Sequence, residues 1–167
     1  SRIAVDRKAG IHVNCLRLIT LLWSLTLNAQ TWADTSVSFI HLNDIYEIQP
    51  VEGGKYGGLA RVATEVDRLR KTMAPAIVTL GGDYLSPSAL GTAKVDGNAL
   101  AGRQMVDVLN LVGIDWATFG NHEFDEGFTE LLRMQKGGCH PVDGCLDGDA
   151  FAGAKFKFLA ANVVYNL

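Results

Sequence analysis

Hydrophobic residues follow two spacings along the sequence, one typical of strands and the other typical of helices. Short, nearly continuous apolar runs predict buried strands, and they occur at residues 37–42, 76–80, 114–119 and 156–161. Between these runs, apolar residues recur every three or four positions, as on one face of a helix. Three helices are expected, with apolar stripes that begin at Leu59, Met105 and Phe128. The order β-α-β-α-β-α-β favours an α/β fold with a largely parallel sheet and helical crossovers.

The N-terminal segment has a different pattern. Basic residues, among them Arg7 and Lys8, precede an apolar stretch at residues 18–27, and small residues follow as far as Ala33. These are the three parts of a secretory signal, and the stretch is shorter than the roughly 20 residues of a membrane-spanning helix. We therefore expect residues 1–33 to be a signal peptide with an upstream extension, and export to the periplasm or the extracellular space. A buried amphipathic helix is the alternative.

Composition narrows the classes of function. The apolar share of 48% and the charged share of 20% fit a soluble globular domain, which we expect at residues 34–167. These residues carry 11 basic and 17 acidic side chains, a net charge of about −6. An acidic surface argues against a nucleic acid polymer as partner. It is compatible with a small phosphate ester if a bound metal supplies local positive charge.

Residues 136–154 form the one long loop between predicted elements, and this loop contains Cys139 and Cys145. In an exported protein, two cysteines so close together predict a small disulfide loop. Two free thiols, or a metal site shared with His140, are the alternatives.

An Asp or Asn stands directly after each of the first three predicted strands, at Asp44, Asp83 and Asn121. Ligands of open parallel sheets bind outside the carboxyl ends of the strands, and oxygen ligands from three strands would suit divalent cations. A single residue of this kind is usually a turn former or a helix cap. Three in succession, preceded by glycines in two cases and followed by His-Glu in one, indicate a metal site.

Longer sequence blocks surround these three positions. The blocks at residues 41–44, 81–83 and 120–123 resemble those of the calcineurin-like metallophosphoesterases. Further stretches are similar to the 5'-nucleotidase family among them, at residues 56–61, 81–88, 119–125 and 159–163. The resemblance covers roughly residues 37–164. It implies the β-α-β-α-β-α-β half of a metallophosphoesterase sandwich, truncated at the C-terminus.

The resemblance also implies a role for each matching residue. Asp83 would bridge two metal ions, with Asp44 as a ligand of the first and Asn121 as a ligand of the second. His122 would stabilise charge on the phosphoryl group or the leaving oxygen, and Asp125 would orient His122. The two ions would be divalent or of mixed valence, drawn from Mn, Zn, Fe, Mg and Ca. Held about 3.5–4 Å apart, they would activate a water and bind phosphoryl oxygens.

Two departures from the family pattern bear on this site. Most relatives have a histidine ligand where Tyr46 stands, and a phenol binds zinc or magnesium poorly at neutral pH, so Tyr46 is a doubtful metal ligand. The later histidine ligands and their Gly-His-x-His block are absent, as is the domain that would bind the substrate. The resemblance gives Glu123 no role. We expect residues 34–167 to be the N-terminal part of a metallophosphoesterase domain, nearly inactive alone.

The expected function is therefore that of an exported, two-metal phosphoric monoester hydrolase of which this chain is a fragment. Its substrate would be a small phosphate ester, most simply a 5'-nucleotide cleaved to nucleoside and phosphate, and no stable partner protein is expected. One alternative is a degenerate, non-catalytic relative that binds phosphate compounds or a partner. Another is a fragment without a function of its own.

Overall fold

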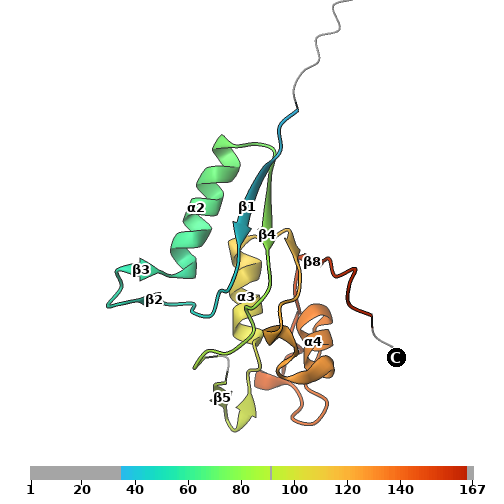
Figure 1. Cartoon of the computed structure of the whole chain (residues 1–167). Helices are drawn as coiled ribbons and strands as arrows, with labels where there is room; N and C mark the ends of the chain where they lie inside the picture. Colours follow the sequence, from blue (N-terminus) through green and yellow to red (C-terminus); the bar gives the residue numbers. More distant parts are fainter. Residues whose placement is uncertain (1–34, 91, 165–167) are drawn as a thin grey trace, which may run out of the picture. The chain divides into compact units, whose positions relative to one another are not determined.

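A parallel sheet forms the centre of the computed structural model, which describes residues 35–90 and 92–164. Its strands are β1 (Ser38–Leu42), β4 (Ala76–Leu80), β7 (Trp116–Ala117) and β8 (Lys157–Phe158), in that spatial order. Three helices, α2 (Leu59–Thr72), α3 (Arg103–Val112) and α4 (Gly127–Lys136), connect successive strands of this sheet (Figure 1). The predicted α/β fold is thus confirmed. The signal-peptide prediction for residues 1–33 lies outside the described residues.

Strands β1 and β4 share one apolar face. Ile40 pairs with Val78 and Leu42 pairs with Leu80, and all four side chains belong to the hydrophobic core or pack against it. Because successive side chains of a strand point to opposite faces, Phe39 lies on the other face of β1, where it is 67% exposed. The helices therefore cover the first of these two faces.

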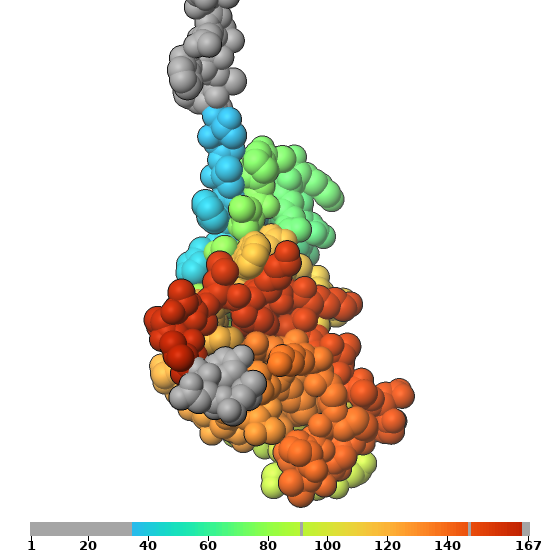
Figure 2. All heavy atoms as spheres, turned by 90° about the vertical axis from the view of Figure 1, so that its right-hand side faces the viewer, coloured from blue at the N-terminus to red at the C-terminus, as the bar shows by residue number. Residues whose placement is uncertain are grey.

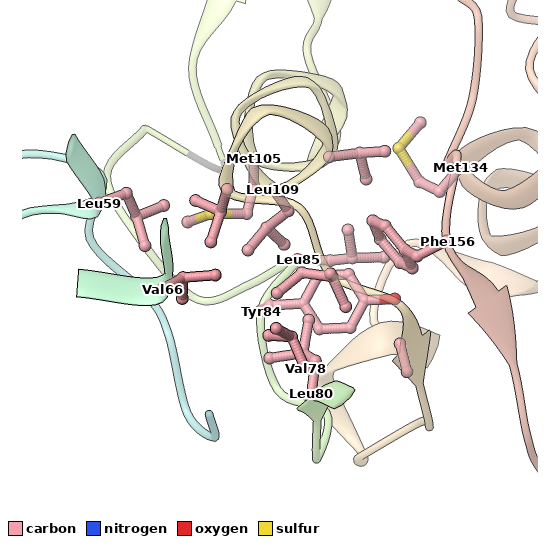
Figure 3. Close-up of a cluster of buried hydrophobic side chains, with 14 of the residues drawn as sticks. Leu59, Val66, Val78, Leu80, Tyr84, Leu85, Met105, Leu109, Met134 and Phe156 are labelled. Carbon is pink, nitrogen blue, oxygen red and sulfur yellow. The ribbon is translucent and has the colours of Figure 1, made fainter. Parts of the chain in front are cut away.

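Helices α2 and α3 and the loop after β4 close the core (Figure 3). Val66 of α2 and Met105 and Leu109 of α3 are each at most 3% exposed. Tyr84, in the loop after β4, is 2% exposed, and its ring packs edge-on against Phe156 with 6.3 Å between centroids. Burial raises the pKa of the Tyr84 phenol well above its ordinary value. Tyr84 therefore anchors this loop in the core.

The helix ends agree with the predicted signals, but two strands are shorter than predicted. Gly113 has a left-handed φ of 84°, and its N–H donates to the Leu109 carbonyl oxygen at 3.1 Å, which ends α3. The apolar runs at 114–119 and 156–161 contain only the two-residue strands β7 and β8. Ile114 and Phe156 are buried outside the strand ladder. Their apolar character therefore reflects burial in the core rather than strand pairing.

Several short elements were not predicted, because two or three residues cannot show a hydrophobic period. They are the antiparallel pair β2 (Pro50–Val51) and β3 (Tyr56–Gly57), the antiparallel pair β5 (Lys94–Val95) and β6 (Asn98–Ala99), and the 3-10 helices η1 (His122–Phe124) and η2 (Leu146–Gly148). Within residues 35–90 and 92–164, none of the helices has the length and apolar character needed to cross a membrane.

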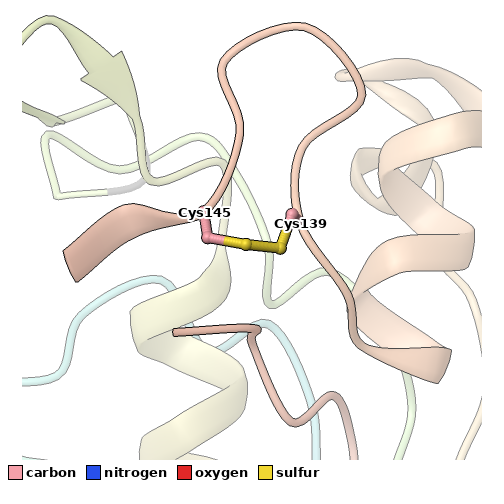
Figure 4. The surroundings of a disulfide bond; sticks show 2 residues. All are labelled: Cys139 and Cys145. Atoms are coloured by element: carbon pink, nitrogen blue, oxygen red, sulfur yellow. A yellow bond between two sulfur atoms is a disulfide. The ribbon is translucent and has the colours of Figure 1, made fainter. Parts of the chain in front are cut away.

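The long loop after α4 is held by several interactions. Cys139 and Cys145 form a disulfide that closes the tip of the loop (Figure 4). The guanidinium groups of Arg103 and Arg133 lie 5.5 Å and 5.8 Å from the centre of the Phe151 ring, within the range of cation–π attraction. Figure 2 shows this region (orange) next to the segment around β8 (red). The loop is therefore attached to α3 and α4 through its own side chains.

Candidate functional site

The turns after β1 and β4 place two aspartates at the same end of the sheet. Asp44 and Asp83 have φ values of 53° and 56°, in the left-handed region. This region is uncommon for residues other than glycine, although Asp tolerates it better than most. The Asp44 N–H donates to the Gly82 carbonyl oxygen at 3.3 Å, so the two turns are in direct contact. Such unusual backbone at two neighbouring aspartates is typical of functional sites.

Glycines allow the loops after β4 and β7 to approach each other closely. Gly82 has a φ of 107°, and a Cβ at this position would collide with the backbone nitrogen of Gly120. A Cβ at Gly120 would in turn collide with Oδ1 of Asp83. Replacement of Gly82 would therefore push the two loops apart, and replacement of Gly120 would displace the Asp83 carboxylate. The close approach lets Asp83 Oδ1 accept a hydrogen bond from the His122 N–H at 3.0 Å.

Glu123 joins the same two loops from below the surface. Its side chain is buried, with 1% of the residue exposed, and its two carboxylate oxygens accept four backbone hydrogen bonds. The donors are Asp83 (2.8 Å), Tyr84 (2.8 Å), Leu85 (3.3 Å) and Gly120 (2.6 Å). The sequence analysis gave Glu123 no role. Its place in the Gly-Asn-His-Glu block was the only sequence feature that could have pointed to a role. Its hydrogen-bond partners after β4 lie 38 to 40 positions away, where local sequence patterns do not reach.

His122, Asp125 and Ser86 form a hydrogen-bonded group. His122 Nδ1 lies 2.8 Å from Asp125 Oδ2, and the Ser86 hydroxyl donates a short hydrogen bond to the same oxygen. The hydrogen bond to Asp125 raises the pKa of the His122 imidazole. The hydrogen bonds from Ser86 and then from His122 lower the pKa of the Asp125 carboxyl. Asp125 is therefore the acceptor and His122 carries its proton on Nδ1; sequence reasoning missed Ser86.

Tyr46 occupies the position where relatives were expected to have a histidine ligand. Its hydroxyl donates to Asp44 Oδ1 at 2.9 Å, and its ring meets the His122 ring edge-on with 6.0 Å between centroids. Partial burial, followed by the hydrogen bond to Asp44 and by nearby carboxylates including that of Asp83, raises the pKa of Tyr46 to about 12. The phenol is therefore neutral at physiological pH and acts as a hydrogen-bond donor to Asp44.

Comparison with known proteins decides the family. A family model described as calcineurin-like phosphoesterase matches residues 37–162. The chain belongs to this family. The resemblance seen in the sequence is thus confirmed, and the calcineurin-like phosphoesterases as a family require divalent metal ions.

Two relatives of this calcineurin-like phosphoesterase chain show how much of a longer protein it matches. It is 36% identical to the Acinetobacter calcoaceticus "Uncharacterized protein in pqq-V 5'region", over 64% of this chain and 52% of that protein. It is 29% identical to the snake venom 5'-nucleotidase of Gloydius brevicauda, over 70% of this chain and 20% of that protein. The chain therefore spans about half of the first relative and a fifth of the second.

A solved structure supports the fold. The Haemophilus influenzae NAD nucleotidase matches with a TM-score of 0.50 at 24% identity, over 72% of this chain and 26% of that chain. At this identity the match bears on the fold alone.

The candidate ligands of this calcineurin-like phosphoesterase chain fit part of a metal site. Asp44, Asp83 and Asn121 supply oxygen donors, which suit hard cations such as Mg, Mn and Ca. Contacts through Gly82 and His122 bring their three loops together. In the part of the chain that the structure describes, however, no three His, Cys, Asp or Glu side chains gather as a metal-binding group. The described residues therefore offer oxygen donors on three neighbouring loops, but not a complete set of metal ligands.

Proposed function

We propose that the protein hydrolyses phosphate monoesters, and that its substrates are 5'-nucleotides cleaved to nucleoside and inorganic phosphate. The observation that carries this proposal is the hydrogen bond between Asp83 and the backbone of His122. It joins the loop of a candidate metal ligand to the His122–Asp125 pair at one end of the sheet, in a chain that belongs to the calcineurin-like phosphoesterases. Family membership supports the reaction class, and a relative named 5'-nucleotidase supports the substrate class.

Each residue of the site has a proposed task. Asp44, Asp83 and Asn121 would hold two divalent ions, with Asp83 between them; such ions supply positive charge that polarises the phosphoryl group and activates water. Asp125 keeps the proton of His122 on Nδ1 and the ring in a fixed orientation. Nε2 of His122 is then the ring atom that would contact a phosphoryl or leaving-group oxygen. A protonated imidazole there would stabilise the developing negative charge and donate a proton to the leaving alkoxide.

Tyr46 favours a second candidate function. Its neutral hydroxyl is hydrogen-bonded to Asp44, in the place where a histidine ligand was expected, which would weaken the first metal position. A non-catalytic relative that binds phosphate compounds is therefore the alternative.

Export is a separate part of the proposal. It is supported by the signal-like pattern of residues 1–33 in the sequence and by the Cys139–Cys145 disulfide, since disulfides persist mainly in exported proteins.

The test is phosphate release from AMP by the full-length protein, after metal removal and addition of Mn, Zn or Mg. Asp83→Asn is the informative variant, because Asn tolerates a left-handed backbone and only the charge is lost. We expect its kcat/KM to fall by about 10³-fold, equivalent to about 4 kcal/mol. Asp67→Asn, at an exposed position of α2, is the matched control and should retain full activity. Metal-independent release, or no release from any phosphate ester, would contradict the hydrolase and favour the binding protein.

A further inference from the structure

We propose that Glu123 is a positioning residue that sets the separation of the Asp83 loop from the Asn121–His122 turn, and thereby the metal affinity of the site. This inference rests on the proposed function, because it concerns the ligands assigned there. Glu123 itself would not touch metal or substrate, since it lies beneath the loops with 1% of its surface exposed.

The first argument is the match between acceptors and donors. An ionised carboxylate offers about four lone-pair positions and no donor. In the structure each oxygen of Glu123 accepts two backbone N–H groups: Oε2 from Asp83 and Gly120, and Oε1 from Tyr84 and Leu85. A buried carboxylate is costly unless it is hydrogen-bonded. Among the ion pairs found for the described residues, Glu123 has none. Backbone amides therefore stabilise the buried Glu123 carboxylate.

The second argument is that one oxygen connects two loops. Oε2 lies 2.8 Å from the Asp83 nitrogen and 2.6 Å from the Gly120 nitrogen. Asp83 follows β4 and Gly120 follows β7, so a single atom fixes how far apart these strand ends can be. Asp83 is then held twice, through its backbone by Glu123 and through its side chain by the N–H of His122 at 3.0 Å.

The third argument is the backbone conformation of Asp83. Its φ of 56° is left-handed, and a non-glycine residue remains there only when its surroundings enforce the conformation. Glu123 accepts from the N–H of Asp83 and from those of the next two residues. These three hydrogen bonds hold the turn that carries the Asp83 carboxylate, the candidate metal ligand. Residues behind metal ligands act in this way in many sites, and their loss weakens metal binding.

Glu123→Gln tests the proposal with the smallest possible change. The amide has nearly the same shape, but its NH2 group would face two backbone donors, so two hydrogen bonds are replaced by donor–donor contacts. Glu130→Gln is the matched control. Glu130 is also a buried carboxylate, 7% exposed, but its partner is the Arg133 guanidinium on α4 rather than the strand-end loops.

Two measurements are made on the full-length protein. The first is the Mn²⁺ dissociation constant from calorimetry, together with the electron paramagnetic resonance spectrum of bound Mn²⁺. The second is hydrogen–deuterium exchange of the metal-free protein, followed in peptides that contain residues 83–85 and Gly120. In Glu123→Gln we expect Mn²⁺ affinity to fall about 10- to 100-fold and these amides to exchange about tenfold faster. In Glu130→Gln both should stay within about threefold of the unchanged protein.

Unchanged Mn²⁺ affinity in Glu123→Gln, or an equal loss in Glu130→Gln, would overturn the proposal. If Glu123→Gln does not fold, Glu123→Asp is measured in the same way. Its carboxylate is one methylene shorter and cannot reach both loops, so normal Mn²⁺ affinity in this variant would also overturn it. If the unchanged protein binds no Mn²⁺ at all, the proposed function has failed instead. The exchange data then decide alone whether Glu123 holds the two loops.

Discussion

Residues 35–90 and 92–164 contain two buried carboxylates, and these are compensated in different ways. Glu123, beneath the strand-end loops, accepts its hydrogen bonds from backbone amides. Glu130, on α4 beside the disulfide loop, accepts two hydrogen bonds from the Arg133 guanidinium at 2.9 Å and 2.7 Å. Its other oxygen lies 3.3 Å from His140 Nε2, without hydrogen-bond alignment. The first carboxylate is thus stabilised by backbone amides, and the second is stabilised by the Arg133 guanidinium.

The two clusters also differ in their contact with the candidate metal ligands. His140 Nδ1 accepts hydrogen bonds from the N–H groups of Val142 and Asp143. The Glu130 carboxylate pairs with the guanidinium of Arg133, whose side chain is only 7% exposed. These charges compensate each other within the protein. Around Glu123, backbone amides compensate the buried negative charge, so no neighbouring cationic side chain is needed to stabilise it. There the side chains of His122 and Asp125 are 29% and 42% exposed. The side chains of His140 and Asp143 are about as exposed, at 28% and 38%, so exposure does not separate the two clusters. The hydrogen bond from the His122 N–H to the candidate ligand Asp83 does.

The largest expected effect separates the two histidines of these regions. His122→Ala should lower kcat by about 10²- to 10⁴-fold, because it removes the group proposed to stabilise the leaving oxygen. His140→Ala, in the disulfide loop, should leave kcat within about twofold of the unchanged enzyme. Steady-state hydrolysis of AMP at saturating metal measures both. An equal loss of kcat in the two variants would show that His122 has no special role in the reaction.

In the Glu130 cluster, we expect a substitution to lower the free energy of unfolding and to leave kcat unchanged. Arg133→Met leaves the buried Glu130 carboxylate without its cation, and removal of one partner of a buried pair costs about 3–5 kcal/mol. Arg68→Met, in the exposed pair with Glu65 on α2, should leave the free energy of unfolding nearly unchanged, because exposed ion pairs contribute little. Urea unfolding gives both values. The activity of the molecules that remain folded should be unchanged in either variant; a selective loss of kcat in Arg133→Met would place this cluster in the catalytic machinery.

The smallest expected effect concerns Ser86. Its hydroxyl donates to the Asp125 carboxylate that orients His122, so Ser86→Ala should lower kcat by about tenfold or less, equivalent to about 1 kcal/mol. KM for AMP should change little, since Ser86 is not proposed to contact the substrate. Thr64→Val removes an exposed hydroxyl on α2 and serves as the control. A normal kcat in Ser86→Ala would show that Asp125 and His122 keep their arrangement without this hydrogen bond.

The sequence by itself determined the order of the main strands and helices, and it predicted a candidate site at the strand ends. Strands and helices have local hydrophobic periods, so β4 and the core stripe of α3 could be predicted from residues close together in the chain. Asp44, Asp83 and Asn121 were predicted as ligands because each stands directly after a predicted strand, at the end of the sheet where ligands of parallel sheets bind. These predictions needed only local spacing and the known geometry of such sheets.

Tertiary structure alone decided how these residues are held. The role of Glu123 depends on amides 38 to 40 positions away, and that of Ser86 depends on Asp125, 39 positions away. Tyr46 is only two positions from Asp44, yet whether it binds metal or donates to the carboxylate depends on the left-handed turn at Asp44. Hydrogen bonds are directional over about 3 Å, so sequence spacing cannot reveal them. They follow from the packing that brings the loops after β1, β4 and β7 together.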